Sequence, residues 1–281
     1  MKHGGFHPFF NLIFSIFNFQ FPRRSAPGGP GGFLSIIPAL EKLDRPITIF
    51  VGHFGSGKTE IAVNLAFLWQ SIGKEVTIVD LDLIKPYFRC RLLREDFKAR
   101  VIRLVAPGGE KFYADLPILM PEARGILERS LANNERVVLD VGGDDLGARV
   151  LGSVRDIIDR SKAHLLFVVN TMRPFAEDEQ AIIKKLDQIE AAAQMKVTGL
   201  VANSHLMDET DLGVVGEGVE LAERVSKATS IPLLFCAIIS HLGAETFRAG
   251  GIELPVMPIV RHILPPFTSP PKGFLRPPSV V

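Results

Sequence analysis

The loop formed by residues 51–60, with the sequence VGHFGSGKTE, constrains the fold of this chain more than any other feature. Its pattern G-x-x-x-x-G-K-T ends in Lys58 and Thr59 and has the spacing of a phosphate-binding loop. Such a loop needs a buried strand before it and a helix after it, because N–H groups of the loop and of the helix N-terminus hold the phosphates together. The pattern therefore predicts a strand, a glycine-rich loop and a helix, in that order.

Both flanks of the loop agree with this prediction. Residues 46–51 form a short, β-branched apolar run, which is typical of a buried parallel strand. After the loop, apolar side chains recur on one face of a helix that is expected to end at Gly73. These side chains are Ile61, Leu65, Leu68 and Ile72. An ordinary glycine-rich turn is disfavoured by this context.

The pattern assigns chemical roles within the loop. Lys58 would reach the β- and γ-phosphate oxygens of a nucleotide and take part in catalysis, and the Thr59 hydroxyl would bind Mg²⁺. The predicted nucleotide-binding residues of the loop are Gly52, His53, Phe54, Gly55, Ser56, Gly57, Lys58, Thr59 and Glu60.

Composition limits the partners and the compartment. The 281 residues are 47% hydrophobic, which is enough for one large α/β domain with a full core. A net charge of +1 gives no sign of bulk attraction to nucleic acids or acidic membranes. The two cysteines, Cys90 and Cys236, are far apart and form neither a disulfide framework nor a C-x-x-C site. A cytoplasmic location is expected.

Proline divides the chain into three parts. Of 20 prolines, six lie in residues 1–46 and six in residues 265–281. We predict a poorly ordered N-terminal extension, residues 1–46, with a Gly/Pro linker at 23–32. A nucleotide-binding domain is expected at 47–264, followed by a proline-rich tail at 265–281.

The extension contains one apolar segment, residues 9–21, which is interrupted by asparagine and glutamine. It is too short to span a bilayer, and no small-residue cleavage site follows it. Three interpretations stay open: an interfacial anchor, a partner-binding segment, or a segment that is disordered or results from a wrongly assigned gene start. The last is favoured.

Apolar runs alternate with helical patterns along the remaining chain. Further strands are expected at 76–80, 101–105, 137–140, 165–170, 199–203 and 233–239. Helical periodicity is present at 182–189 and 215–222. This alternation predicts right-handed βαβ units and a doubly wound, mostly parallel sheet between two layers of helices, the α/β fold of P-loop NTPases.

Polar residues close three of these runs, at the edge where such sheets bind ligands. The second run closes with Asp80-Leu-Asp82, the fourth with Asp140-Val-Gly-Gly, and the sixth with Asn203. Carboxylates facing a phosphate loop suit Mg²⁺ held partly through water, so Thr59, Asp82 and Asp140 are the predicted metal ligands. Each of these residues alone could equally be a helix cap. Their occurrence in this order after the phosphate loop is stronger evidence for a nucleotide and metal site than any one of them.

The motif order resembles that of the SIMIBI class of P-loop NTPases, and within it the MinD/ParA and cobyrinic-acid-synthase-type (CobQ/CobB/MinD/ParA) nucleotide-binding domains. The resemblance covers about residues 47–264 and depends on the loop, D-x-D after the second strand and D-x-x-G after the fourth. It implies that Asp82 orients or activates the attacking water, that Asp140 supports Mg²⁺, and that Asn203 binds the base, usually adenine.

One position departs from the family pattern. MinD/ParA-type loops carry a second lysine after the first glycine, which reaches the partner's phosphate in a sandwich dimer, and His53 stands there instead. A mostly neutral imidazole is a poor substitute for a fixed cation. Lys85 or Arg89 could supply charge. Turnover in the isolated protein is therefore expected to be slow and to depend on Asp82.

The resemblance favours an ATPase switch or motor that uses ATP and Mg²⁺ and acts on an unidentified protein partner, and formation of a homodimer stays open. A GTP-dependent metallochaperone has a similar loop but binds guanine through N-K-x-D, where this chain has N-S-H-L at 203–206. Two further functions stay open: an ATP-dependent small-molecule kinase or ligase, and a nucleotide-binding switch without turnover.

Overall fold

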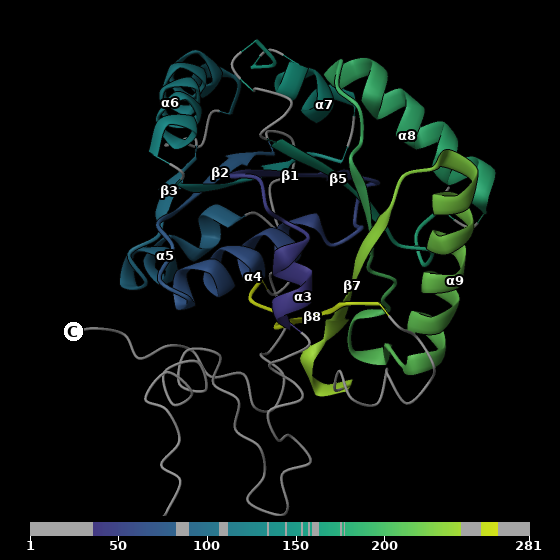
Figure 1. The fold of residues 1–281 in the computed structure, drawn as a ribbon. Helices are drawn as coiled ribbons and strands as arrows, with labels where there is room; N and C mark the ends of the chain where they lie inside the picture. The colour runs from purple at the N-terminus through teal and green to yellow at the C-terminus, as the bar shows by residue number, and fades with distance from the viewer. Residues whose placement is uncertain are drawn as a thin grey trace, which may run out of the picture.

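A fully parallel, eight-stranded sheet forms the centre of the protein, and Figure 1 shows helices packed on both of its faces. The computed structural model describes residues 36–82, 90–106, 112–133, 135–143, 145–152, 154–156, 158, 163–174, 176, 178–242 and 254–263. The strands are β1 (Ile47–Gly52), β2 (Val76–Leu81), β3 (Arg103–Val105), β4 (Arg136–Val141), β5 (Ala163–Val169), β6 (Gly199–Ala202), β7 (Leu233–Ile239) and β8 (Val256–Ile259).

The strand order is β3-β2-β4-β1-β5-β6-β7-β8, so β1 lies inside the sheet between β4 and β5. Strands β2, β3 and β4 lie on one side of β1, and strands β5 to β8 lie on the other side. This order confirms the predicted doubly wound α/β fold. It also places the loop after β1 at the point where the winding changes direction, which is where such sheets bind ligands.

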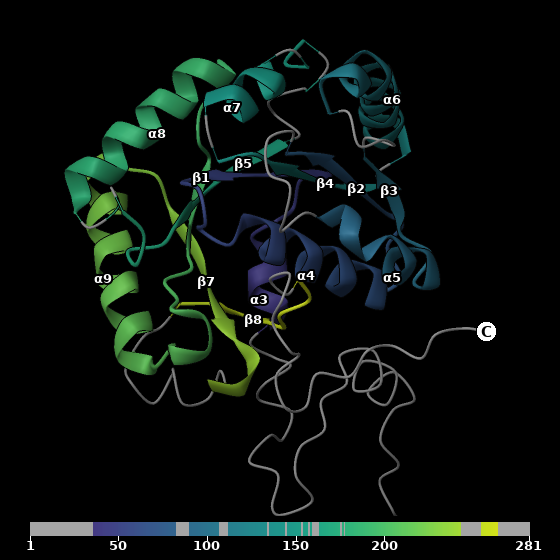
Figure 2. The same ribbon diagram turned by 180° about the vertical axis from the view of Figure 1, so that it is seen from behind.

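Two hydrophobic clusters hold the helices to the sheet. Alternate residues of β1 belong to opposite clusters, with Ile49 facing one layer and Phe50 the other. The first layer contains α6 (Phe112–Asn133), α7 (Asp145–Gly152), α8 (Glu179–Ala193) and α9 (Leu212–Thr229). The second contains α3 (Ile36–Glu41), α4 (Lys58–Ser71) and α5 (Arg94–Ala99). Both layers are visible in Figure 2, where α8 and α9 lie side by side.

The seven predicted strands are present, with no end shifted by more than two residues. The eighth strand, β8, was not predicted, because its short run contains Pro258. Its position at the edge of the sheet explains this proline, since an edge strand needs ladder hydrogen bonds on one side alone.

The folded core begins before residue 47, where the sequence analysis placed its boundary. Helix α3 precedes β1, and Ala39 and Leu43 are each only 1% exposed. The Arg136 guanidinium on β4 donates to the carbonyl oxygens of Leu43 and Arg45, at 3.2 and 2.6 Å. Residues 1–35 and 264–281, and the predictions made for them, lie outside the described residues. In the part that is described, no helix has the length and apolar character needed to cross a membrane.

Replacing Leu43 by alanine tests this boundary. The side chain is buried in the cluster that contains Trp69 and Phe97, so we expect the free energy of unfolding to fall by about 2–5 kcal/mol. Urea denaturation measures this change. Leu92→Ala is the control, because Leu92 is 60% exposed and should change stability by less than about 0.5 kcal/mol. Equal, small effects of both substitutions would show that the segment before β1 is not part of the core.

Candidate functional site

The loop between β1 and α4 has a backbone that requires glycine. Gly52 and Gly57 have φ angles of 141° and 89°, which side chains rarely adopt. A Cβ atom on Gly52 would lie 2.6 Å from the Val168 carbonyl oxygen, and one on Gly57 would lie 2.2 Å from Asn203 Nδ2. The loop therefore packs directly against the ends of β5 and β6, with no space for larger residues.

Lys58 lies inside this loop. Its side chain is buried, and its Nζ donates to the carbonyl oxygens of Gly52 and His53, at 3.2 and 2.8 Å. Gly143, in the glycine pair after β4, approaches the same ammonium, because a Cβ atom there would lie 2.8 Å from Lys58 Nζ. The structure thus brings together the loop lysine and the D-x-x-G segment.

The carboxylates after β2 and β4 lie beside the loop strand. Asp140 is in register with Phe50 of β1 on one side and with Asp80 of β2 on the other. Asp80 accepts a hydrogen bond from Arg91 Nε at 2.8 Å and another from the Asp82 backbone N–H at 3.0 Å. The Arg91 ion pair neutralises Asp80, and the carboxylates of Asp82 and Asp140, the predicted ligands for metal and water, are buried at the same edge of the sheet.

These groups fit a magnesium ion. The hydroxyl of Thr59, in the first turn of α4, and the carboxylates of Asp82 and Asp140 are hard oxygen ligands, and all three residues are at most 9% exposed. Among the residues that the structure describes, no group of three or more His, Cys, Asp or Glu side chains could hold a metal. Magnesium in nucleotide sites is bound through one or two carboxylates together with phosphates and water, and a site with two carboxylates and one hydroxyl fits that pattern.

Asn203, at the end of β6, contacts the loop directly. Its Nδ2 donates to the Ser56 carbonyl oxygen at 2.7 Å, and its backbone N–H donates to Val169 of β5 at 2.8 Å. The side chain therefore fastens the loop to β6, a role that the sequence analysis did not foresee. Its Oδ1 receives no hydrogen bond from the rest of the described protein and can face a base.

Two predicted loop residues take unexpected positions. The His53 ring packs edge-on against Phe167 of β5, with 6.5 Å between ring centroids, and Phe54 is 66% exposed. The packing of His53 on the sheet gives no support to a role across a dimer interface. Lys85 and Arg89, the suggested substitute cations, lie outside the described residues.

Glu60 binds the backbone after β8. Its carboxylate accepts hydrogen bonds from the N–H groups of His262 and Ile263, at 3.0 and 2.7 Å. Burial raises the pKa of Glu60 to about 7, although these donors oppose the shift. One turn later, Asn64 exchanges two hydrogen bonds with the Val260 backbone, at 2.8 and 2.9 Å. Both side chains tie the helix after the loop to the C-terminal strand.

The sequence analysis missed Arg173 and His205, which follow β5 and β6. Arg173 Nε donates to the Gly55 carbonyl oxygen at 2.8 Å, so its guanidinium lies on the loop. Burial lowers the pKa of His205 to about 4, and the charges of Arg173 and Arg261 act in the same direction. Both positions could have been found, because they follow strands at the carboxyl edge of the sheet.

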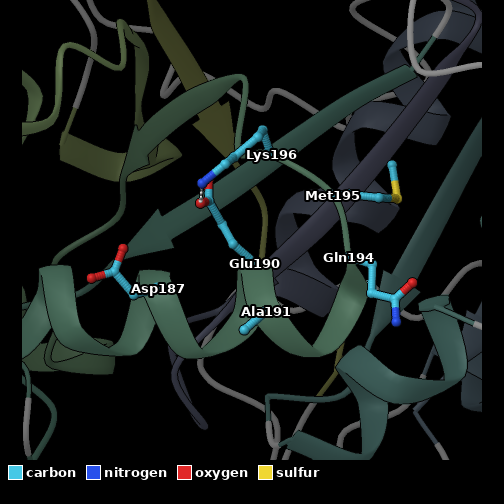
Figure 3. Close-up of a pocket in the computed structure, with 6 residues that line it drawn as sticks. All are labelled: Asp187, Glu190, Ala191, Gln194, Met195 and Lys196. Carbon is cyan, nitrogen blue, oxygen red and sulfur yellow. Dashed lines mark hydrogen bonds and ion pairs between the residues drawn. The ribbon is translucent and has the colours of Figure 1, made fainter.

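A separate hollow of about 470 Å³ lies at the C-terminal end of α8 (Figure 3). Its lining residues are Asp187, Glu190, Ala191, Gln194, Met195 and Lys196. Helix α8 connects two parallel strands, so its C-terminal end lies at the edge of the sheet opposite the loop. Two of the lining residues, Glu190 and Lys196, form an ion pair (Figure 3). The hollow is not part of the site around the loop.

No protein-family model matches the chain, and no curated protein matches it significantly. Solved structures with a similar arrangement include the cell division protein FtsY of Thermotoga maritima, at 21% identity over 73% of this chain and 68% of that chain, with a TM-score of 0.46. FtsY of Mycoplasma mycoides is 15% identical over 81% of this chain and 76% of its own, with a TM-score of 0.48. The signal recognition particle 54 kDa protein of Aeropyrum pernix, in complex with GDP, is 17% identical over 81% of this chain and 53% of its own, with a TM-score of 0.45.

The strand order and the loop of this chain define its class. A parallel sheet whose loop strand lies next to the strand ending in Asp140, with Lys58 and Thr59 opening the following helix, is a P-loop nucleotide-binding fold. The D-x-D and D-x-x-G segments at the same edge are those that carried the resemblance to the SIMIBI class.

The low pKa of His205 predicts a pH-dependent stability. The native state keeps the imidazole neutral down to about pH 4, whereas an unfolded histidine takes up a proton near pH 6.5. The free energy of unfolding is therefore unaffected by this titration above pH 6.5, and it decreases as the pH falls from 6.5 toward 4, because only the unfolded state takes up the proton. We expect the free energy of unfolding to drop more between pH 7 and pH 5 in the wild type than in His205→Gln, as measured by urea denaturation. Equal drops would contradict the buried, neutral state of His205.

Proposed function

We propose that this protein is a Mg²⁺-dependent ATPase of the SIMIBI class, similar to MinD/ParA proteins, that acts as a switch controlled by a partner protein in the cytoplasm. The observation that carries the proposal is the position of Lys58. Its ammonium lies within 3.2 Å of two loop carbonyl oxygens and beside the Gly143 backbone, next to strands that end in buried carboxylates.

Triphosphate binding follows from this position. Phosphate oxygens carry charge and attract an ammonium more strongly than neutral carbonyl oxygens do, so Lys58 would exchange its loop partners for the nucleotide. The N–H groups at the start of α4 would donate to the same phosphates. Gly143 lies beside this lysine and is therefore placed to respond to the terminal phosphate.

The carboxylates supply the remaining chemistry. Thr59 and Asp140 would hold Mg²⁺, which neutralises charge on the phosphates when it is bound. Asp82, buried at the end of β2, would orient the water that attacks the terminal phosphate. Its position after Asp80 is fixed, because Arg91 bonds both to the Asp80 carboxylate and to the Asp82 carbonyl oxygen.

Adenine is the proposed base. Asn203 is followed by Ser204 and His205, so the chain lacks the lysine and the aspartate with which N-K-x-D proteins bind guanine.

Lys58→Ala tests the proposal. Loss of the ammonium removes a charge-assisted contact to each of two phosphates, so we expect the affinity for Mg·ATP to fall at least a hundredfold. Isothermal titration calorimetry with ATP and with GTP measures the affinity and the preference for the base. Lys74→Ala, at an exposed position beyond the same helix, should bind as the wild type does. Unchanged binding by Lys58→Ala would refute the phosphate loop, and a tenfold preference for GTP would make the protein a GTPase.

Asp82→Asn tests the mechanism. Asparagine keeps the shape of the side chain but orients water less well, so Mg·ATP affinity should change less than threefold while the single-turnover rate falls by about 10²–10⁴. Quenched-flow measurement of ATP cleavage gives this rate. Asp187→Asn, on the exposed surface of α8, is the control. A rate that is unaffected by Asp82→Asn would assign the water to another group.

A further inference from the structure

Arg173 lies on the phosphate loop although it is distant in the sequence. It follows β5 in the segment of residues 170–173, and its Nε donates to the Gly55 carbonyl oxygen at 2.8 Å. A Cβ atom on Gly55 would lie only 3.2 Å from the same nitrogen, so the guanidinium packs directly against the loop.

The segment that carries Arg173 is anchored to β6. Asn170 Oδ1 accepts hydrogen bonds from the backbone N–H groups of Met172 and His205, at 3.0 and 3.4 Å. The Thr171 backbone N–H donates to Ser204 Oγ at 3.1 Å, and the two hydroxyl oxygens of these residues are 2.9 Å apart. The backbone before Arg173 is thus fixed on both sides, and the guanidinium is held in place rather than free to move away.

The charge of Arg173 has no counter-ion in the described structure. No carboxylate of the described residues forms an ion pair with it, and burial alone lowers the pKa of its partly buried guanidinium. His205, on the loop after β6, is close enough for the charge of Arg173 to help lower its pKa, and it is neutral. A partly buried cation without a carboxylate is unfavourable unless an anion binds there.

The unused hydrogen-bond donors of Arg173 also indicate that an anion binds there. A guanidinium has five N–H donors, and the described structure uses one of them, at Gly55. The remaining donors belong to a group whose planar geometry matches phosphate oxygens. They lie at a loop whose sequence and backbone are those of a phosphate-binding loop.

We propose that Arg173 binds a phosphate of the nucleotide held by the loop, and that it supplies, within one chain, the fixed cation that His53 does not. The inference rests on the proposed function. It changes the expected mechanism, because a cation from the same chain makes a second protomer unnecessary for charge stabilisation. Such arginines raise phosphoryl-transfer rates by about 10³–10⁵.

A purely structural role for the Gly55 contact is the competing explanation, and three variants of the full chain separate the two. Arg173→Gln keeps an N–H donor for the Gly55 carbonyl oxygen but removes the charge. Arg173→Lys keeps the charge but loses the planar donor group. Arg224→Gln, on the exposed face of α9, removes an arginine far from the loop and is the matched control.

Isothermal titration calorimetry with Mg·ATP at several sodium chloride concentrations, together with single-turnover cleavage, measures the effect. We expect Arg173→Gln to lower affinity by roughly ten- to a hundredfold and to weaken the salt dependence, because one ionic contact is lost. Arg173→Lys should recover part of the affinity and the salt dependence. The single-turnover rate should fall further than the affinity in both variants, and Arg224→Gln should match the wild type.

The outcomes distinguish this inference from the proposed function. If Arg173→Gln binds Mg·ATP as tightly as the wild type while Lys58→Ala does not bind, the protein is a nucleotide-binding P-loop protein and the role of Arg173 is refuted. Equal losses in Arg173→Gln and Arg173→Lys, with unchanged salt dependence, would show a structural contact and also refute it. Absence of binding by the wild type to either ATP or GTP would overturn both proposals.

Discussion

The parallel pairing of β1 with β4 and β5 is the constraint on which the rest of the structure depends. Every residue of β1 is buried, because helices cover both faces of the sheet and strands flank both of its edges. The phosphate loop begins at the carboxyl end of β1. Gly52 allows the backbone to turn there, because a side chain at this position would collide with the Val168 carbonyl oxygen. The ends of β2, β4, β5 and β6 meet at the same edge, which is why residues from distant segments surround one loop.

Contacts from three later parts of the chain hold this loop. Asn203 bonds to Ser56 and Arg173 to Gly55, while Glu60 binds the backbone beyond β8. Each contact joins a polar side chain of one segment to a backbone group of the other. It therefore depends on where the second segment lies and not on which side chains that segment carries. These contacts fix the loop and the first turn of α4 relative to β5, β6 and the segment after β8.

The charges around the loop are divided between its two sides. Carboxylates lie toward β2 and β4, where Arg91 neutralises Asp80 and where Asp82 and Asp140 are the proposed groups for water and metal. Cations lie toward β5 and β8, where Arg173 has no carboxylate among the described residues and Arg261 is paired with the exposed Asp208. A nucleotide with bound Mg²⁺ matches this division, because its metal would face the carboxylates and its phosphates the guanidinium. Electrostatics and fold thus favour the same ligand.

The sequence by itself determined the α/β class, the loop and the strand-end residues Asp82, Asp140 and Asn203, because these depend on local patterns of apolar and glycine residues. It did not determine the edge strand β8, whose run is short and contains Pro258, or the inclusion of α3 and the residues after it in the core, which depends on burial of Ala39 and Leu43. Only the tertiary structure decided that His53 packs on Phe167, that Asn203 fastens the loop, and that Arg173 lies on Gly55. These contacts join residues more than a hundred positions apart, and the physical reason is that strand order, which sets which loops become neighbours, is not encoded in any local pattern.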